Sequence, residues 1–183
     1  MKVGILQVGR VESQTLNYVK ENLPKIFPKI ECEMIPETIP IPEEAYNSLR
    51  KQHNSSVILA IIKNLFKKKP YRRVLGITEV DLYVPQLNFV FGQAECPGKV
   101  ALISLFRLKP EFYGQPPNRK LFLERTLKEA VHELGHTFGL GHCRNPFCVM
   151  FFSNSILDTD KKEKNFCEKC QKTIEKKIGE LEN

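Results

Sequence analysis

Residues 132–142 read HELGHTFGLGH and contain three of the four histidines of this 183-residue chain. On a helix, His132 and His136 stand one turn apart on the same face, with the carboxylate of Glu133 beside them. This spacing gives a divalent metal two imidazole nitrogens and places a base against the water that the metal holds. The stretch therefore predicts a metal site on a helix.

The third histidine of the stretch extends this pattern. His142 lies too far along to share the helix face unless the chain turns back, and Gly139 is the residue type that permits such a turn. Three nitrogens and an open position are typical of a catalytic zinc site rather than a sealed structural one. The alternative is a helix that carries these residues by chance, for which the odds are on the order of one in 10⁵.

Four cysteines follow the histidines in two pairs, Cys143 with Cys148 and Cys167 with Cys170. Their spacing matches the ligands of a tetrahedral zinc site made of four thiolates. The alternatives are two disulfides or four buried thiols, and disulfides are less expected because we see no secretory signal. The sequence thus predicts two zinc ions, one catalytic and one structural. Since Cys143 directly follows His142, the two sites share one backbone joint.

The histidine motif followed by Met150 resembles the metzincin clan of zinc peptidases, in which a methionine turn lies beneath the metal. The cysteine pattern is similar to the archaemetzincin family in particular. These motifs span residues 132–170, about a fifth of the chain. By this resemblance, His132, His136 and His142 bind the catalytic zinc, Glu133 is the general base, Met150 is the structural Met-turn residue, and Cys143, Cys148, Cys167 and Cys170 bind the structural zinc. Phe152 stands where some clan members have a tyrosine, so oxyanion stabilisation by a tyrosine is not expected there.

Length and composition predict one soluble domain. The chain is long enough to bury a core, and no apolar run reaches the roughly 18 residues of a membrane span. The apolar stretch in Met1–Val8 is too short for a signal peptide. We therefore expect a cytoplasmic monomer in one metallopeptidase domain, residues 1–183. Its upper subdomain would end at residue 142, and residues 143–183 would carry the Met-turn, the zinc knuckle and a C-terminal helix.

Hydrophobic periodicity predicts alternating strands and helices, followed by helices alone. Strands are expected over Lys2–Val8, Glu31–Ile35, Val74–Thr78, Leu82–Val84, Asn88–Phe91 and Val100–Leu105. Helices are expected over Ser13–Ile26, Glu43–Lys51, Ser56–Lys67 with Ser55 as its cap, a long segment capped by Asn118, and Glu168–Leu181, although Val57–Ile62 is also compatible with a buried strand. This order resembles the metzincin fold, an α/β (α+β) architecture whose mixed, mostly parallel sheet has one antiparallel edge strand. By that resemblance, residues 88–95 form the edge along the cleft.

The metal site and the sheet edge together predict zinc-dependent hydrolysis of peptide bonds. An exposed edge offers unpaired backbone groups to which a peptide or unfolded protein substrate can add as a strand. The alternative is a catalytically inactive, zinc-stabilised binding or regulatory protein for nucleic acid, for which the net charge and the four-cysteine site would matter. The basic run Lys67–Arg73 could contact nucleic acid or acidic substrates, but it is interpreted as the solvated end of a helix. Glu133 favours the enzyme, because it contributes nothing to holding zinc. We expect neither a nucleic-acid partner nor a membrane partner.

Three further residues lie outside these motifs. His53 is interpreted as a surface or loop residue rather than a ligand. Cys32 and Cys96 are interpreted as small buried apolar residues, with a disulfide between them as the alternative.

Overall fold

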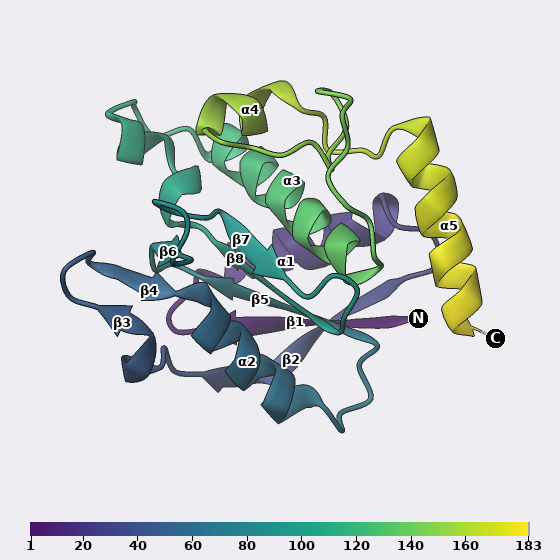
Figure 1. The fold of residues 1–183 in the computed structure, drawn as a ribbon, viewed down its shortest axis with the longest axis horizontal. Helices are drawn as coiled ribbons and strands as arrows, with labels where there is room; N and C mark the ends of the chain where they lie inside the picture. Colours follow the sequence, from purple (N-terminus) through teal and green to yellow (C-terminus); the bar gives the residue numbers. More distant parts are fainter. Residues whose placement is uncertain (183) are drawn as a thin grey trace.

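The computed structural model describes residues 1–182 and is built around a five-stranded sheet in the order β2-β1-β5-β8-β7 (Figure 1). The strands are β1 (Lys2–Val8), β2 (Glu31–Ile39), β5 (Arg73–Thr78), β7 (Gly92–Ala94) and β8 (Val100–Ser104). Neighbouring strands are parallel except for β7 and β8, which are antiparallel. The prediction of a mostly parallel sheet with one antiparallel edge strand is confirmed.

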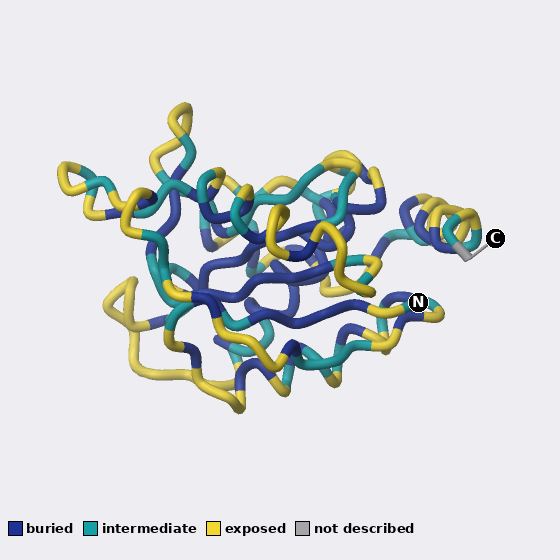
Figure 2. The backbone as a smooth tube through the Cα atoms, turned by 90° about the horizontal axis from the view of Figure 1, so that it is seen from below, coloured by how far each residue is buried: buried dark blue, intermediate teal, exposed yellow. Residues whose placement is uncertain are grey.

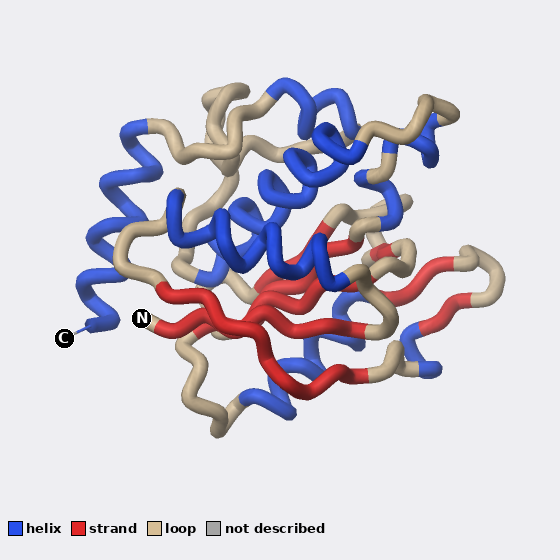
Figure 3. The backbone as a smooth tube through the Cα atoms, turned by 180° about the vertical axis from the view of Figure 1, so that it is seen from behind, coloured by secondary structure: helices blue, strands red, loops and turns tan. Residues whose placement is uncertain are grey.

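Helices cover both faces of this sheet (Figures 1 and 3). Helices α1 (Ser13–Asn22) and α3 (Arg119–Thr137) pack on one face, and α2 (Ser55–Phe66) packs on the other. Along β8, Ala101 and Ile103 belong to the first core, whereas Val100 and Leu102 belong to the second. This alternation follows from the two-residue period of a strand. Strands β1, β5 and β8 are almost entirely buried, as expected for parallel strands covered on both faces. Figure 2 shows buried segments running through the middle of the molecule.

Shorter elements surround the sheet. Strands β3 (Tyr46–Asn47), β4 (Gln52–Asn54) and β6 (Leu82–Tyr83) form a second small sheet, and the 3₁₀ turns are η1 (Leu23–Lys25), η2 (Glu43–Ala45), η3 (Phe106–Leu108) and η4 (Pro110–Tyr113). Helices α4 (Ile156–Lys161) and α5 (Glu168–Glu182) follow α3. Ile174 and Ile178 anchor α5 to the core shared by α1 and α3. Among the described residues, no helix is long and apolar enough to cross a membrane.

The helix predicted over Glu43–Lys51 is wrong, because this segment forms η2 and a hairpin of β3 and β4. Leu49 is 96% exposed, so the segment lacks the buried apolar face that stabilises a surface helix. The side chain of Asn47 accepts a hydrogen bond from the backbone N–H of Arg50 (3.1 Å), a local turn that competes with helical pairing. Lys51 has a φ of 54°, which a right-handed helix does not allow.

Several predicted boundaries also shift. Helix α1 ends at Asn22, earlier than predicted, because the 3₁₀ turn η1 begins at Leu23 and contains Pro24, which has no N–H to continue the helical pairing. Strand β2 continues through Pro36 to Ile39. A proline is tolerated there because β2 is the outer strand and its register with β1 shifts nearby. The strand alternative for Val57–Ile62 is wrong, since α2 spans it.

Two helix starts are set by asparagine side chains. Asn118 accepts a hydrogen bond from the N–H of Leu121 (3.0 Å) and begins α3, as predicted. Helix α2 is capped by Asn54, which accepts from the N–H of Ser56, and not by Ser55. Ser55 is instead the first residue of that helix.

The edge strand begins later than predicted. Asn88–Phe91 is not a strand, and Val90 forms only an isolated bridge with Leu82. The preceding residues turn around Pro85, where the N–H of Leu87 donates to the carbonyl of Val84 (3.0 Å). The chain therefore pairs with β8 only from Phe91 onwards, and strand β7 begins at Gly92.

Candidate active site

Helix α3 carries two histidines into the middle of the molecule. His132 is 4% exposed, and His136 follows one turn later. Nδ1 of His132 lies 2.8 Å from the carbonyl oxygen of Val149, and Nδ1 of His136 lies 2.7 Å from that of Leu140. Because a carbonyl oxygen only accepts hydrogen bonds, each neutral ring carries its proton on Nδ1. The lone pair of each ring is therefore on Nε2.

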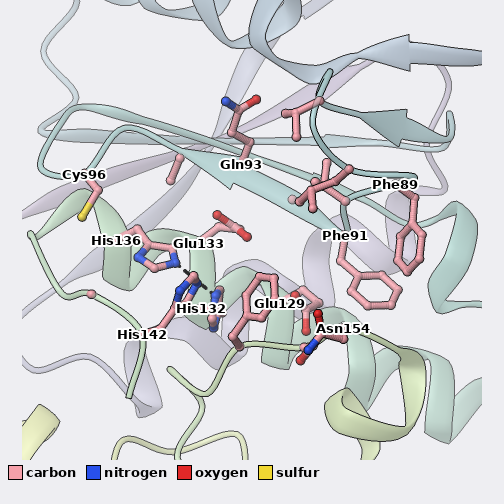
Figure 4. Close-up of a pocket in the computed structure, with 18 of the residues that line it drawn as sticks. Phe89, Phe91, Gln93, Cys96, Glu129, His132, Glu133, His136, His142 and Asn154 are labelled. Atoms are coloured by element: carbon pink, nitrogen blue, oxygen red, sulfur yellow. Dashed lines mark hydrogen bonds between the residues drawn. The ribbon is translucent and has the colours of Figure 1, made fainter. Parts of the chain in front are cut away.

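The third histidine reaches the same place because the chain turns back after α3. Gly139 has a φ of 87°, the conformation for which glycine is suited, as the sequence indicated. The ring centroid of His142 lies 5.4 Å from that of His132 and 4.9 Å from that of His136. One ring nitrogen from each histidine lies within 4.8 Å of the others (Figure 4). The ring of Phe152 packs against that of His142, with 4.7 Å between the ring centroids.

The geometry of the first two histidines fits a cation. Their Nε2 atoms lie only 3.0 Å apart, and both carry lone pairs. Such a pair is stable only with a proton or a metal between the nitrogens. Burial lowers the pKa of His132 well below its ordinary value, and the charge of Lys162 adds to this effect. A proton is therefore disfavoured, whereas neutral imidazoles are the usual ligands of zinc.

Glu133 lies beside the histidines and beneath the edge strand. Its side chain reaches this position because residue 92 is a glycine. A Cβ on Gly92 would lie 2.5 Å from Cγ of Glu133 and 2.7 Å from the carbonyl oxygen of Leu102. Burial raises the pKa of Glu133 well above its ordinary value, Glu129 raises it further, and Lys162 opposes both effects.

A buried ion pair lies one turn before Glu133. The carboxylate of Glu129 and the ammonium of Lys162 are 2.9 Å apart, and their side chains are 3% and 0% exposed. The hydroxyl of Thr159 donates to the same carboxylate oxygen at 3.1 Å. Sequence reasoning missed this pair. Glu129 gave a usable signal, since it stands four residues before Glu133 on the same helix face, but no pattern marks Lys162.

Met150, which follows the third histidine by eight residues, packs against the histidine-bearing helix α3. Met150 is fully buried, and a Cβ on Gly135 would lie 2.6 Å from its sulfur. Gly135, which lies between His132 and His136 in the sequence, therefore leaves room for the Met150 side chain to contact α3. The backbone carbonyl of Met150 also accepts from the N–H of Cys143 (2.8 Å). The sequence pattern did not single out Gly135, although it lies inside the motif.

The four cysteines form a second group. The sulfur atoms of Cys143, Cys148, Cys167 and Cys170 all lie within 4.8 Å of one another, and none is in a disulfide. Burial alone would raise the pKa of Cys167, but the backbone N–H of Cys170 and the neighbouring thiols outweigh it and lower that pKa to about 7. Burial instead raises the pKa of Cys148 and that of Cys170, so without a metal only one thiolate forms readily in this group. A metal bound by all four sulfurs would have to displace the remaining protons.

A cleft of about 610 Å³ opens above the histidines. Residues 87–94 line one side, and the histidines with residues 152–154 line the other (Figure 4). Cys96 also lines this cleft and is exposed, because it lies in the turn between β7 and β8. The prediction that Cys96 is buried is therefore wrong.

The register of β7 leaves part of its backbone open. Phe91 and Glu95 bond to β8 through the pairs Ser104 N–H to Phe91 C=O (2.8 Å) and Glu95 N–H to Val100 C=O (3.1 Å). In an antiparallel pair, only every second residue bonds to the partner strand, and the residues between them direct their N–H and C=O groups away from it. Those residues of β7 are its two ends, Gly92 and Ala94, and both line the cleft.

Two other sequence interpretations can be checked. Cys32 and Cys96 are both free thiols, so the disulfide alternative is wrong, and Cys32 is only partly buried. His53 lies in β4, half-buried, with its ring 5.0 Å from that of Tyr46. It belongs to no group of metal-ligating side chains within residues 1–182.

Comparisons with known proteins agree with this geometry. The model of peptidase family M54 matches residues 17–176. Over 175 residues the chain is 49% identical to an archaemetzincin of Methanocaldococcus jannaschii, covering 96% of this chain and 93% of that protein. Over 178 residues it is 46% identical to an archaemetzincin of Pyrococcus furiosus, covering 96% of this chain and 93% of the relative.

Solved structures give the same result. The crystal structure of an archaemetzincin from Methanopyrus kandleri matches with a TM-score of 0.86 and 39% identity, over 98% of this chain and 96% of the other. The crystal structure of an archaemetzincin from Archaeoglobus fulgidus matches with a TM-score of 0.80 and 40% identity, over 94% of this chain and 99% of the other. These matches favour the enzyme over the inactive binding protein. The chain therefore belongs to the archaemetzincins, peptidase family M54, and is a zinc metallopeptidase with a three-histidine and a four-cysteine group that fit two zinc ions.

Proposed function

We propose that this chain hydrolyses peptide bonds at the three-histidine group, with zinc held by His132, His136 and His142 and with Glu133 as the general base. The observation that carries this proposal is the convergence of three imidazoles and one buried carboxylate at the base of the cleft. Cys143, Cys148, Cys167 and Cys170 would hold the second, structural zinc.

Zinc bound to three imidazoles supplies a Lewis acid and lowers the pKa of a coordinated water towards neutrality. Glu133 would accept a proton from the attacking water and pass it to the leaving amine. The raised pKa of Glu133 suits this task, because a carboxylate of ordinary pKa is a weak base near pH 7. Val149 and Leu140 would keep two of the rings oriented through their carbonyl oxygens.

The substrate would be a peptide or an unfolded protein segment that adds to the sheet beside β7. The open backbone groups of Gly92 and Ala94 would pair with it in the manner of an additional strand. Because Glu133 lies directly under Gly92, a peptide bond opposite this glycine would be placed over the carboxylate. Phe152 covers His142 with an apolar ring, so no phenol supports an oxyanion there.

The variant Glu133→Gln tests the assignment, because an amide keeps the shape of the side chain but cannot accept the proton. The zinc content of the purified variant should equal that of the wild type, while hydrolysis of a quenched peptide library should fall by about 10³-fold or more. A chelator-treated wild-type sample serves as the metal-free control. Hydrolysis at wild-type rate in the clean variant would refute the role of Glu133, and a wild-type protein inactive on every library peptide would refute the proposed hydrolysis.

A further inference from the structure

A second cavity, of about 430 Å³, lies next to the catalytic cleft. The two cavities share Phe89 and Asn154, so they adjoin at these residues, and none of the three histidines lines the second one. In Figure 4, Phe89 and Asn154 lie on the side of the cleft away from Cys96 and the histidines. The second cavity therefore extends the cleft in one direction, beyond the site of chemistry.

The cavity has apolar walls at Phe89, Tyr113, Ile156 and Leu157, beside the neutral polar residues Gln115, Asn154 and Ser155. Its charged residues form ion pairs. Arg107 forms two hydrogen bonds to Asp81 (2.7 and 2.8 Å), and Arg125 forms two to Asp160 (both 2.7 Å). The guanidinium of Arg107 also lies over the ring of Phe89, 4.4 Å from its centroid. Each guanidinium already has a carboxylate partner, so neither charge is left without a counter-charge. A neutral apolar group is the better match for the cavity.

Exposed apolar side chains surround the cavity. Leu157 is 72% exposed and Tyr113 is 37% exposed, and both line it together with the buried Ile156. A ligand that covered Leu157 would remove apolar surface from water, which is the main source of binding free energy for such a group.

The edge strand fixes where this cavity meets a bound peptide. Gly92 marks the position of Glu133, and Phe89 lies three residues earlier along the chain. Because residues 89–91 precede strand β7, the two positions are at most about 10 Å apart, the length of three extended residues. Antiparallel pairing is the more stable arrangement for an added strand, and a peptide antiparallel to β7 would run from Ala94 towards Phe89. Its C-terminal part would therefore reach the cavity.

We propose that this cavity is a substrate subsite for an aromatic or large aliphatic side chain, about three residues C-terminal to the scissile bond. The proposal rests on the function proposed above and deepens it, since it names a preference of the same cleft. Full burial of a large apolar side chain changes affinity by about 10- to 100-fold. Because the cavity is open to solvent, we expect a preference near the lower end of this range.

The test measures binding separately from cleavage. Zinc-loaded Glu133→Gln protein would be titrated into two fluorescent peptides that differ only by phenylalanine or serine at the third residue after the cleavage position. Anisotropy should show about tenfold tighter binding of the phenylalanine peptide. Leu157→Ser in the same background should reduce this ratio to about threefold or less. Leu49→Ser is the matched control, because Leu49 is 96% exposed and lines neither cavity.

Each outcome bears on one proposal. Equal binding of the two peptides, or a ratio that Leu157→Ser and Leu49→Ser change alike, overturns the subsite. Cleavage of both peptides by wild-type protein at equal kcat/KM, with no binding preference, leaves the peptidase proposal intact and removes the subsite alone. A binding preference sensitive to Leu157→Ser, without any cleavage by the wild type, supports the subsite and refutes the hydrolysis.

Discussion

Replacing Gly92 with alanine should damage catalysis without removing zinc. The added Cβ would lie 2.5 Å from Cγ of Glu133 and 2.7 Å from the carbonyl oxygen of Leu102. Carbon atoms in contact need about 3.5 Å, so the Glu133 side chain must move by about 1 Å. The second contact is with backbone of a central strand and is not relieved by rotating a side chain.

A misplacement of about 1 Å in a reacting group costs on the order of 10²-fold in rate. We therefore expect kcat of Gly92→Ala on a quenched peptide to fall by about 10²-fold, with both zinc ions still present by metal analysis. Overpacking should also lower the free energy of unfolding by about 1 to 3 kcal/mol, measured by urea denaturation.

A second glycine gives the matched control for this experiment. Gly179 lies in α5, and a Cβ there would meet no atom within 4 Å. Gly179→Ala should leave kcat unchanged and raise stability slightly, because alanine is the better helix former by about 1 kcal/mol. If Gly92→Ala retained more than a third of wild-type kcat, or lost the histidine-bound zinc, the reasoning about Glu133 would be refuted.

Three other predictions concern the four-cysteine group, the buried ion pair and His53. Cys148→Ser should weaken zinc binding at the histidine group by about tenfold or more. Cys148 shares its group with Cys143, which directly follows His142 in the chain, so loss of the structural zinc would free the third histidine to move. Metal counting by mass spectrometry checks this, and an unchanged affinity contradicts it. Lys162→Met should lower the free energy of unfolding by about 3 to 5 kcal/mol, because it leaves the buried carboxylate of Glu129 without its counter-charge. The control Lys172→Met should change it by less than about 1 kcal/mol, because Lys172 and its partner Glu168 are both exposed. Equal losses in the two variants contradict the argument. Burial lowers the pKa of His53 below 6.5. The unfolded chain therefore binds this proton more readily than the folded protein does, and stability falls as the pH drops below 6.5. His53→Gln should make the loss of stability between pH 7 and pH 5 smaller in urea denaturation, and an equal loss in the variant and the wild type refutes this prediction.

The histidine motif was readable from the sequence because a helix imposes a fixed geometry on nearby residues. His132, His136 and Glu133 lie within two turns, so their arrangement needs only the helical period. The return of His142 needed one further signal, and Gly139 supplied it. The parallel strands were predictable for a similar reason, since buried strands are continuous apolar runs such as β8.

The parts that sequence reasoning missed depend on contacts between distant segments. Gly92 matters only because the strand it belongs to crosses α3 at Glu133, a distance of 41 positions along the chain. Lys162 is buried against Glu129 by the packing of α4 on α3, which no local pattern encodes. The hairpin at Leu49 was misjudged because polar turn contacts, rather than apolar periodicity, determine its path.

The residues that support the histidines come after them in the sequence, which has a consequence for the order in which the site forms during synthesis. The carbonyl of Val149 orients His132, Met150 presses on Gly135, and the four-sulfur group is complete only with Cys170. A chain still emerging from the ribosome has the helix but not yet these supports. The three histidines are therefore synthesised before the residues that support them, and both groups take the geometry described above only once Cys170 has been added.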